Sequence, residues 1–371
     1  MKISIDKQLL LDSINIASKA VSSRTTQPIL ECLLLTAEDN GIRLYGNDLR
    51  VGIKTAEIPA RVDERGSVAI NCKMFSDIVK KMPGDLITIE SNPQNVVFFK
   101  SDRTQMKLLG QNAIEYPTLP EVEVDKVFSL SAAKFREMIR QTIFSAAVVE
   151  SKPILTGELM QINGGSLNLV AVDGFRIAFR KIEDEHLDPD AQFEVVIPAA
   201  SLSELVKLLP SDGNDILKFH FTEKHILFEL PTYTLTSRLL EGEFLKYSQI
   251  FNDDFSTYVR LSRQELLDSL ELAFLLGKDD KQLPVRLEVQ SDKVIVTSNG
   301  ERGSSYNEVM GEIDGNELEI AFNPKYLIDA LRVVTDREIT LTFTGSLSPL
   351  TIRSIDSDSY KYLILPLRLK A

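Results

Sequence analysis

The side chains most able to do chemistry in this sequence are three histidines, two cysteines and one short run of charges. His186 lies in a charged segment, and His220 and His225 flank a predicted turn between two strands. None of the histidines has the spacing of a metal-binding helix such as HExxH, and two cysteines cannot form a structural zinc site by themselves. The run KDDK at 278–281 has carboxylates that could bind a divalent ion, but its composition is more typical of a solvated loop. We therefore predict no metal site.

Motifs of the common enzyme classes are also missing from the sequence. It contains no GxxxxGK[ST] phosphate loop, no GxGxxG after a strand and no GxSxG nucleophile turn. We predict a protein that is not an enzyme and that uses no cofactor. An enzyme whose carboxylates come from distant parts of the chain stays open as an alternative, because such a site leaves no local motif.

The composition is that of an ordinary globular protein. The chain has 371 residues, 43% of them hydrophobic and 26% charged, which suffices for two or three domains with their own cores. It has neither an apolar run of about 20 residues for crossing a membrane nor a signal peptide, so we expect no membrane partner and a cytoplasmic location. Cys32 and Cys72 lie in apolar segments, which favours reduced thiols in the core, with a disulfide between them as the alternative.

The elements that would position any functional residue recur six times along the chain. Each copy has a short alternating strand, a polar joint, and a helix of about three turns with apolar residues at i, i+3, i+4 and i+7. The copies start at residues 3, 68, 128, 195, 259 and 318, and two or three strand-like runs separated by turn residues follow each helix. We therefore predict six similar units of one helix and about four strands.

The units pair into domains. Asp48 precedes Asp173 by 125 residues, the same offset as from Ile3 to Phe128, and acidic, turn-rich segments at 112–126 and 240–255 read as linkers. This predicts an α+β protein of three similar domains, each made of two halves. The domains are expected at 1–125, 126–253 and 254–371.

The distribution of charge bears on nucleic-acid binding. A net charge of −12 argues against such binding if the charge is spread evenly. The predicted helices, however, carry 12 basic and 9 acidic residues, whereas the whole chain has 42 and 54 (helix windows 6–20, 72–82, 131–146, 199–209, 262–274 and 324–334). Solvated amphipathic helices would also bear lysine and arginine, but the contrast with the acidic remainder favours a helix surface that meets phosphates.

Five segments carry a resemblance to a known family. They are Arg24–Leu30, Pro153–Gly157, Ala171–Ala178, Phe322–Leu327 and Tyr362–Leu369. In this order and spacing, and together with the sixfold repeat, they resemble the beta subunit of bacterial DNA polymerase III, the sliding clamp. The resemblance covers the whole chain, and it is the set of segments rather than any single motif that is specific.

The resemblance implies the DNA clamp fold and a head-to-tail homodimer that closes into a ring around duplex DNA. Twelve helices about 10 Å apart would enclose a hole of roughly 28 Å, wide enough for a duplex about 20 Å across. Such a ring would confer processivity on the replicative DNA polymerase without sequence preference. The clamp loader, other polymerases and repair proteins would also be partners, through short Gln/Leu/Phe motifs. A β-rich scaffold that binds only proteins is the remaining alternative.

Three sets of site residues follow from the resemblance. It implies DNA contacts at Arg24, Lys73 and Lys152, although Pro153-Ile154 and Ala199-Ala200 stand where the family often has basic or aromatic residues. It implies dimer contacts at Met106 and Leu108 on one side and at Leu275 and Leu276 on the other. It implies a peptide-binding pocket formed by Leu155, Val172, Gly174, Phe175, Arg176, Ile177, Leu245, Gln249, Ile250, Asn323, Tyr326, Pro349, Leu363, Ile364, Leu365, Pro366, Leu367, Arg368 and Leu369.

Overall fold

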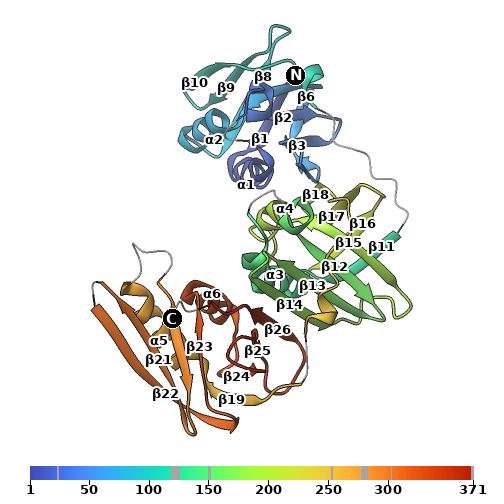
Figure 1. Ribbon diagram of the computed structural model, residues 1–371. Coiled ribbons are helices and arrows are strands. Elements are labelled where there is room, and N and C mark those ends of the chain that lie inside the picture. The colour runs from blue at the N-terminus through green and yellow to red at the C-terminus, as the bar shows by residue number, and fades with distance from the viewer. Residues whose placement is uncertain are drawn as a thin grey trace. The chain divides into compact units, whose positions relative to one another are not determined.

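The computed structural model describes residues 1–22, 25–117, 126–148, 152–251, 254–276, 283–301 and 303–368 (Figure 1). The chain forms two compact units. Unit 1 comprises residues 1–133 and 203–239, and unit 2 comprises residues 134–202 and 240–371. Each unit is described by itself.

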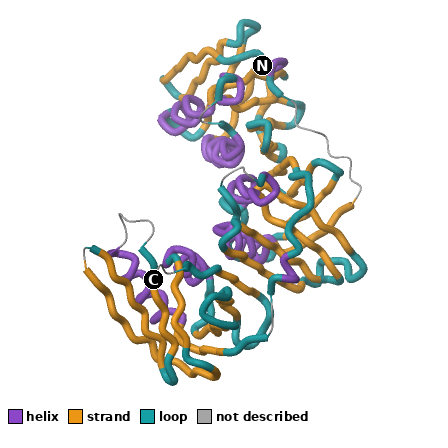
Figure 2. The backbone as a smooth tube through the Cα atoms, in the orientation of Figure 1, coloured by secondary structure: helices purple, strands orange, loops and turns teal. Residues whose placement is uncertain are grey.

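The six predicted strand-and-helix copies are all present, which confirms the repeat (Figure 2). In every copy the helix follows the strand almost without a break. The pairs are β1 (Lys2–Asp6) with α1 (Lys7–Ala17), β7 (Gly66–Asn71) with α2 (Cys72–Lys81), β11 (Lys126–Ser131) with α3 (Ala132–Thr142), β15 (Gln192–Pro198) with α4 (Ala199–Leu205), β19 (Thr257–Ser262) with α5 (Arg263–Leu276), and β23 (Leu318–Phe322) with α6 (Pro324–Val333).

Local sequence explains where the helices start and end. The side chains of Asp6, Asn71 and Asn323 accept hydrogen bonds from backbone N–H groups of the first turns of α1, α2 and α6, which satisfies donors that have no partner within the helix. Three helices are shorter than expected. α1 and α3 give way to 3₁₀ turns at Ser18–Ala20 and Ile143–Ser145, and α4 ends at Leu205 rather than 209. The segment after α4 leads into Pro210, which cannot continue a helix.

Three further strands follow each helix, so each half has the four expected strands. The first half also has two short strands, β5 (Ile58–Pro59) and β6 (Arg61–Glu64). The other strands are β2 (Cys32–Ala37), β3 (Gly41–Asn47), β4 (Val51–Thr55), β8 (Leu86–Ser91), β9 (Val96–Ser101), β10 (Thr104–Leu109), β12 (Gly157–Asn163), β13 (Ser166–Val172), β14 (Arg176–Glu183), β16 (Ile216–Phe221), β17 (His225–Leu230), β18 (Tyr233–Arg238), β20 (Val285–Val289), β21 (Lys293–Gly300), β22 (Gly303–Gly315), β24 (Glu338–Phe343), β25 (Leu350–Arg353) and β26 (Tyr360–Ile364).

The halves exchange their first strands. In unit 1, β1 pairs with β8 of the next half as well as with the short β6 of its own, while β7 pairs with β2 of the preceding half. The same exchange recurs as β11 with β16, β15 with β12, β19 with β24, and β23 with β20. Each half therefore depends on the other to complete its sheet.

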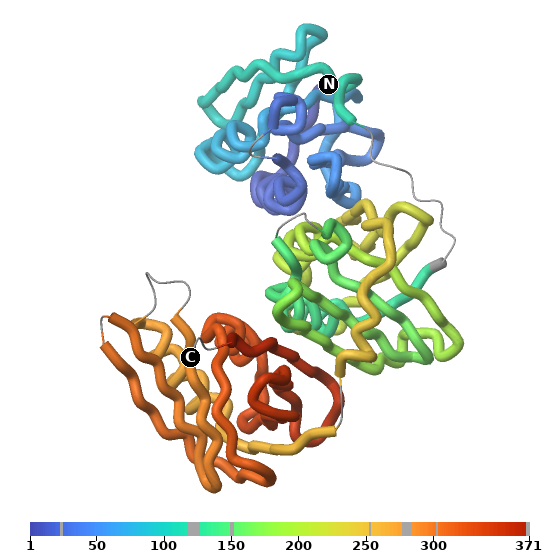
Figure 3. Tube along the Cα trace, in the orientation of Figure 1, coloured from blue at the N-terminus to red at the C-terminus, as the bar shows by residue number. Residues whose placement is uncertain are grey.

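Antiparallel pairing also joins the sheets of successive domains. In unit 1, β4 pairs with β18, and we call this the first junction. In unit 2, β14 pairs with β26, the second junction, so strands far apart in sequence lie side by side (Figure 3). The two junctions share one register. Lys54 pairs with Thr234 in the first junction, and Phe179 pairs with Lys361 in the second. Lys54 and Phe179 are equivalent positions, because their numbers differ by the repeat offset of 125.

Apolar helix faces cover the sheets from one side. In unit 1, Leu10, Ile14 and Ala17 of α1 pack with Phe75 and Val79 of α2 in a core that includes β1, β2 and β3. In unit 2, α5 and α6 each bury one apolar face in the core that contains β19 to β26. The described helices are all too short or too polar to span a bilayer. Cys32 and Cys72 are both free thiols, and burial raises the pKa of each to about 11.

Candidate peptide-binding and DNA-binding sites

The predicted peptide pocket lies entirely in unit 2, at the second junction. Three of its residues, Val172, Ile177 and Leu363, belong to one apolar cluster, and Leu155 packs against it. The cluster also contains Leu159, Val170 and Val196, with Ile154, Phe179, Leu240, Phe244, Tyr247 and Phe251 packed against it. Segments 154–179, 240–251 and the last strand therefore meet in one apolar floor.

A tight turn between β13 and β14 forms one wall of this site. The carboxylate of Asp173 accepts hydrogen bonds from the backbone N–H groups of Phe175 and Arg176, at 2.9 and 3.1 Å. Gly174 has a φ of 90°, a conformation that glycine adopts without steric cost. The turn leaves the ring of Phe175 58% exposed, stacked on the ring of Tyr326 with centroids 6.2 Å apart.

Arg176 is buried beneath this wall. Its guanidinium group donates to Asp173 at 2.9 Å, to Asp329 at 2.9 Å and to the carbonyl oxygen of Phe144 at 2.6 Å. It also lies 4.5 Å from the ring centroid of Tyr326, a cation–π contact. Since Arg176 is only 9% exposed, its contacts are internal.

The chain end forms a second wall. Beyond β26, Leu365 N–H donates to the carbonyl oxygen of Phe175 at 2.9 Å, and Leu367 N–H donates to that of Ala321 at 2.8 Å. The side chains of Leu365 and Leu367 are each 39% exposed. Leu245 and Ile250 are similarly exposed, and we call the set Phe175, Leu245, Ile250, Leu365 and Leu367 the apolar surface. Exposed apolar side chains of this kind suit an extended peptide with apolar side chains.

The remaining predicted pocket residues divide into several groups. Ile364 was expected in the pocket, but it is 1% exposed and belongs to the core of α5 and α6. Side chains alternate along a strand, so Ile364 points away from the apolar floor that Leu363 faces. Asn323 caps α6, where its side chain accepts from Lys325 N–H at 3.0 Å. The other residues are Gln249, which is exposed, Pro349 in the loop before β25, Pro366 and Arg368 in the chain end, and Leu369, which lies outside the described residues.

Lys73 provides the best-defined candidate contact to DNA. It lies in the first turn of α2 with its side chain exposed to solvent, and Lys80 and Lys81 lie exposed in the last turn. Within the described part of the chain, none of these three lysines forms an ion pair. Arg24 lies outside the described residues, and Lys152 is exposed before the 3₁₀ turn Pro153–Thr156 in unit 2.

Most basic residues of the other helices are neutralised. The pairs are Lys134 with Asp184 at 2.8 Å, Arg140 with Glu137 at 3.1 Å, Lys325 with Asp329 at 2.6 Å and Arg332 with Glu271 at 2.8 Å, and Lys207, just after α4, pairs with Glu204 at 2.7 Å. Burial raises the pKa of Asp184, but hydrogen bonds from Lys134 and His186 outweigh it and hold the pKa below its ordinary value. The excess of positive charge on the helices is therefore concentrated on α2, which the sequence count did not distinguish.

The residues predicted to form the dimer interface lie on two separate elements. Met106 and Leu108 belong to β10, the last strand of a five-stranded sheet, and Met106 is 43% exposed. Leu275 and Leu276 end α5, and Leu275 is 63% exposed. Exposed apolar side chains on an unpaired sheet edge are the usual mark of a protein interface.

Sequence reasoning missed a long strand next to α5. β22 has 13 residues and pairs with β21 along Gly303–Met310, and its other edge is unpaired there among the described residues. Tyr306 and Met310 on this strand are 61% and 56% exposed. The sequence signal that could have revealed this strand is a run of apolar residues spaced among polar ones, over about twice the usual length of a strand.

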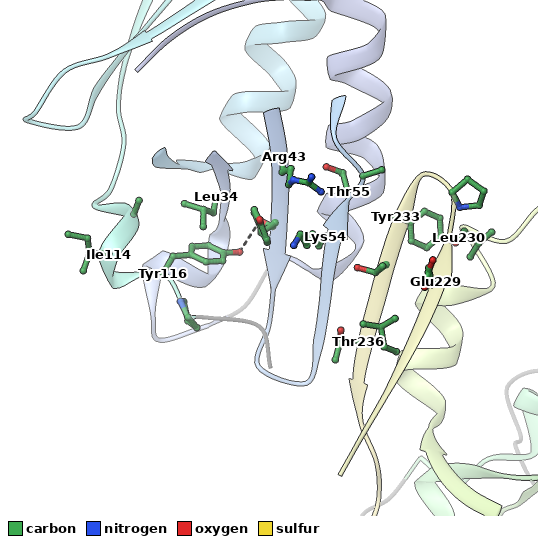
Figure 4. A pocket seen from close by; sticks show the side chains of 17 residues that line it. Leu34, Arg43, Lys54, Thr55, Ile114, Tyr116, Glu229, Leu230, Tyr233 and Thr236 are labelled. Carbon is green, nitrogen blue, oxygen red and sulfur yellow. Dashed lines mark hydrogen bonds between the residues drawn. The ribbon is translucent and has the colours of Figure 1, made fainter. Parts of the chain in front are cut away.

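Unit 1 contains a cavity of about 890 Å³ at the first junction. Figure 4 shows Leu34, Tyr116 and Lys54 from the first domain facing Glu229 and Thr236 of β17 and β18. The Tyr116 hydroxyl group hydrogen bonds to the carbonyl oxygens of Cys32 and Tyr45, at 3.2 and 3.1 Å. The lining also includes Pro117.

The described residues contain no group of three or more histidine, cysteine or acidic side chains placed to bind a metal. Of the histidines, His186 lies 2.6 Å from Asp184 and His220 lies 2.6 Å from Glu229. Each of these contacts joins one histidine to one carboxylate. The run at 278–281 lies outside the described residues.

Comparison with known proteins agrees with this geometry. Models of the N-terminal, central and C-terminal domains of the DNA polymerase III beta subunit match residues 1–120, 129–246 and 248–368. The beta sliding clamps of Bacillus subtilis (strain 168) and Halalkalibacterium halodurans are 33% and 36% identical, over 99% of this chain and 100% of theirs. The crystal structure of a putative DNA polymerase III beta subunit from Eubacterium rectale, at 36% identity, has a TM-score of 0.96, and that of the sliding clamp from Bacillus subtilis, at 32% identity, also has 0.96. Each covers 100% of both chains.

The fold is thus a three-domain DNA clamp, which is an accessory factor and not an enzyme. The chain belongs to the family of DNA polymerase III beta subunits, the beta sliding clamps. Its function is that of a sliding clamp that makes a DNA polymerase processive, with DNA and polymerase as its partners.

Proposed function

We propose that two copies of this chain form a head-to-tail ring around duplex DNA in the cytoplasm, with domains at 1–125, 126–253 and 254–371. The observation that carries the proposal is the use of fourth strands. Of the six halves, four pair their fourth strands at the two junctions, β4 with β18 and β14 with β26. β10 and β22 are the two that remain, so one chain offers one of each for a third junction. A heterologous contact of this kind closes into a ring when the rotation allows it.

Side chains support the same pairing. Met106 and Leu108 accompany β10, while Leu275, Leu276, Tyr306 and Met310 accompany β22 and α5. Burying the exposed members of this set, Met106, Leu275, Tyr306 and Met310, would stabilise the joint at about 25 cal/mol for each Å² removed from water.

Inside the ring, Arg24, Lys73 and Lys152 would contact phosphates. Such contacts carry no sequence information and allow movement along the duplex. The unpaired lysines of α2 make the first domain the main DNA-contacting part. Ala199 and Ala200 at the start of α4, with Pro153 and Ile154, leave the second domain with fewer contacts.

The apolar surface would receive short Gln/Leu/Phe motifs of the replicative polymerase, the clamp loader, other polymerases and repair proteins. The predicted pocket residues apart from Ile364 remain the proposed set. The apolar floor would accept the leucine and phenylalanine side chains, and the polar edges would fix the peptide backbone.

Retention on DNA tests the ring. The protein is loaded on nicked circular DNA with a clamp loader and ATP, isolated by gel filtration, and the DNA is then linearised. We expect retention on the circle and rapid loss from the linear form. Equal retention on both forms would show an ordinary affinity contact instead, and binding of peptides without any retention on circles would favour the scaffold alternative.

A further inference from the structure

Asp329 of α6 contacts the apolar surface only indirectly, and it is not one of the residues that the family resemblance implies. Its side chain is 16% exposed and accepts a hydrogen bond from Arg176 at 2.9 Å. Tyr326, one turn earlier on the same helix face, carries the ring on which Phe175 stacks. Asp329 and Tyr326 thus hold the β13–β14 turn from one helix.

The internal repeat shows that this turn does not need an arginine to form. At the equivalent turn in unit 1, Asp48 accepts from the backbone N–H groups two and three residues ahead, at 2.9 and 2.7 Å. Asp173 makes the same two bonds, at 2.9 and 3.1 Å. The position of Arg176, however, is occupied there by Val51. Arg176 therefore has a role beyond closing the turn.

That role is to fasten the turn to two helical segments. The guanidinium group of Arg176 donates hydrogen bonds to Asp173 within the turn, to Asp329 on α6 and to the carbonyl oxygen of Phe144 after α3. A planar group held in three directions has little rotational freedom, and hydrogen bonds between charged groups are stronger than neutral ones. Charged hydrogen bonds therefore help to fix the wall that bears Phe175, in addition to the stacking of Phe175 on Tyr326.

We propose that Asp329 is a positioning residue for peptide binding: its negative charge orients Arg176, and Arg176 holds Phe175 and Tyr326 in the arrangement that the peptide meets. The inference rests on the proposed function of the apolar surface. It predicts that a residue without peptide contact controls peptide affinity.

The same carboxylate offers its own matched control. Asp329 also accepts from Lys325 at 2.6 Å, but the Lys325 side chain is 58% exposed, and exposed pairs contribute little. Lys325→Ala removes this partner and leaves the bond to Arg176. Asp329→Asn keeps the shape and removes the charge, and Asp329→Glu restores the charge.

Peptide titration is the first test. A fluorescein-labelled peptide of the form Gln-Leu-Ser-Leu-Phe is titrated with the full chain, and fluorescence anisotropy gives the affinity. We expect Asp329→Asn to weaken binding about tenfold, Asp329→Glu to recover most of the affinity, and Lys325→Ala to bind as the parent does. In an Arg176→Val background, Asp329→Asn should have no further effect, because both changes act through one contact. Fully additive effects, or unchanged affinity of Asp329→Asn, would overturn the proposal.

A second readout separates this inference from the proposed function. The chain has no tryptophan, so Phe175→Trp introduces a single reporter on the wall itself. Without peptide, Asp329→Asn should shift its emission to the red and increase quenching by acrylamide, while circular dichroism and Tm show an intact fold. If the parent fails to bind the peptide but this shift occurs, the proposed function is wrong while the positioning contact stands. If the parent binds and neither readout changes, the inference is wrong.

Discussion

The hydroxyl oxygen of Thr142 lies 2.6 Å from a carboxylate oxygen of Glu158, and both side chains are fully buried. The same hydroxyl lies 2.9 Å from the carbonyl oxygen of Met138, which can only accept. One hydroxyl proton cannot serve both neighbours. Both contacts are hydrogen bonds when Glu158 is protonated and donates to Thr142, which then donates to Met138. Burial raises the pKa of Glu158 from its ordinary value of 4.5 to about 8, in agreement with this arrangement.

Glu158 should make the protein less stable as the pH rises. Between the unfolded pKa of 4.5 and the folded pKa of about 8, the native state binds one more proton than the unfolded state. The contribution is therefore complete below pH 4.5 and disappears as the pH rises through about 8. Glu158→Gln should flatten this dependence by about 2–4 kcal/mol between pH 5 and 9. Urea unfolding at several pH values measures it, with the exposed Glu312→Gln as control. An unchanged slope in Glu158→Gln would show that the carboxyl group is ionised in the native state.

The lysines of α2 should govern the salt dependence of DNA binding. Changing Lys73, Lys80 and Lys81 to glutamine should weaken binding to a short linear duplex. It should also reduce the slope of the logarithm of the binding constant against the logarithm of the salt concentration, by about 0.9 for each phosphate that a lysine no longer neutralises. Lys207, Lys325 and Arg332 are already paired with acidic side chains, so the corresponding glutamine variants serve as the control. A greater weakening in the control than in the α2 variant would place the DNA contacts elsewhere.

The third junction should depend on both β22 and α5. Met310→Lys, and separately Leu275→Ala with Leu276→Ala, should move the sedimentation coefficient from dimer toward monomer, because burying a charge or truncating an apolar side chain at a joint costs about 1–3 kcal/mol. Leu347, which is 79% exposed in the β24–β25 loop, provides Leu347→Lys as the control. A parent protein that sediments as a stable monomer would remove the basis for the ring.

The chain end should contribute to peptide affinity but little to stability. β26 ends at Ile364, so removing residues 365–371 keeps the strand but removes Leu365 and Leu367 of the apolar surface and the backbone bonds to Phe175 and Ala321. We expect peptide affinity to fall at least tenfold and the unfolding free energy to change by less than about 1 kcal/mol. Combining the truncation with Arg176→Ala should leave the dimer intact and weaken binding further. Unchanged titration curves would reject the assignment of the apolar surface.

Sequence periodicity was sufficient to predict the six helices and their buried faces. The spacing of Leu10 and Ile14, for example, marks the face that α1 buries. It could not predict the strand exchange, since β1 and β7 both bury apolar residues and each would fit either sheet. Pairing between strands is a matter of tertiary contacts, which local patterns do not contain.

The candidate sites were predicted unevenly for a related reason. The family resemblance placed Leu155, Val172, Ile177 and Leu363 together, and in the structure the last three form one buried cluster against which Leu155 packs. It could not place Ile364 on the opposite face before the strand's orientation was known. The neutralisation of Lys134 by Asp184 was equally hidden, because the two residues are 50 positions apart and meet only through the fold.

The exchange of first strands bears on whether a half can fold alone and on how such a repeat could have arisen. A single half, of about 60 residues, would lack the strand that its sheet receives from the other half, so it should not be stable alone. Two identical halves, however, would complete each other by reciprocal donation. A short ancestral chain could therefore have assembled from separate copies first, and fusion of the copies end to end would then have preserved contacts that already existed between molecules.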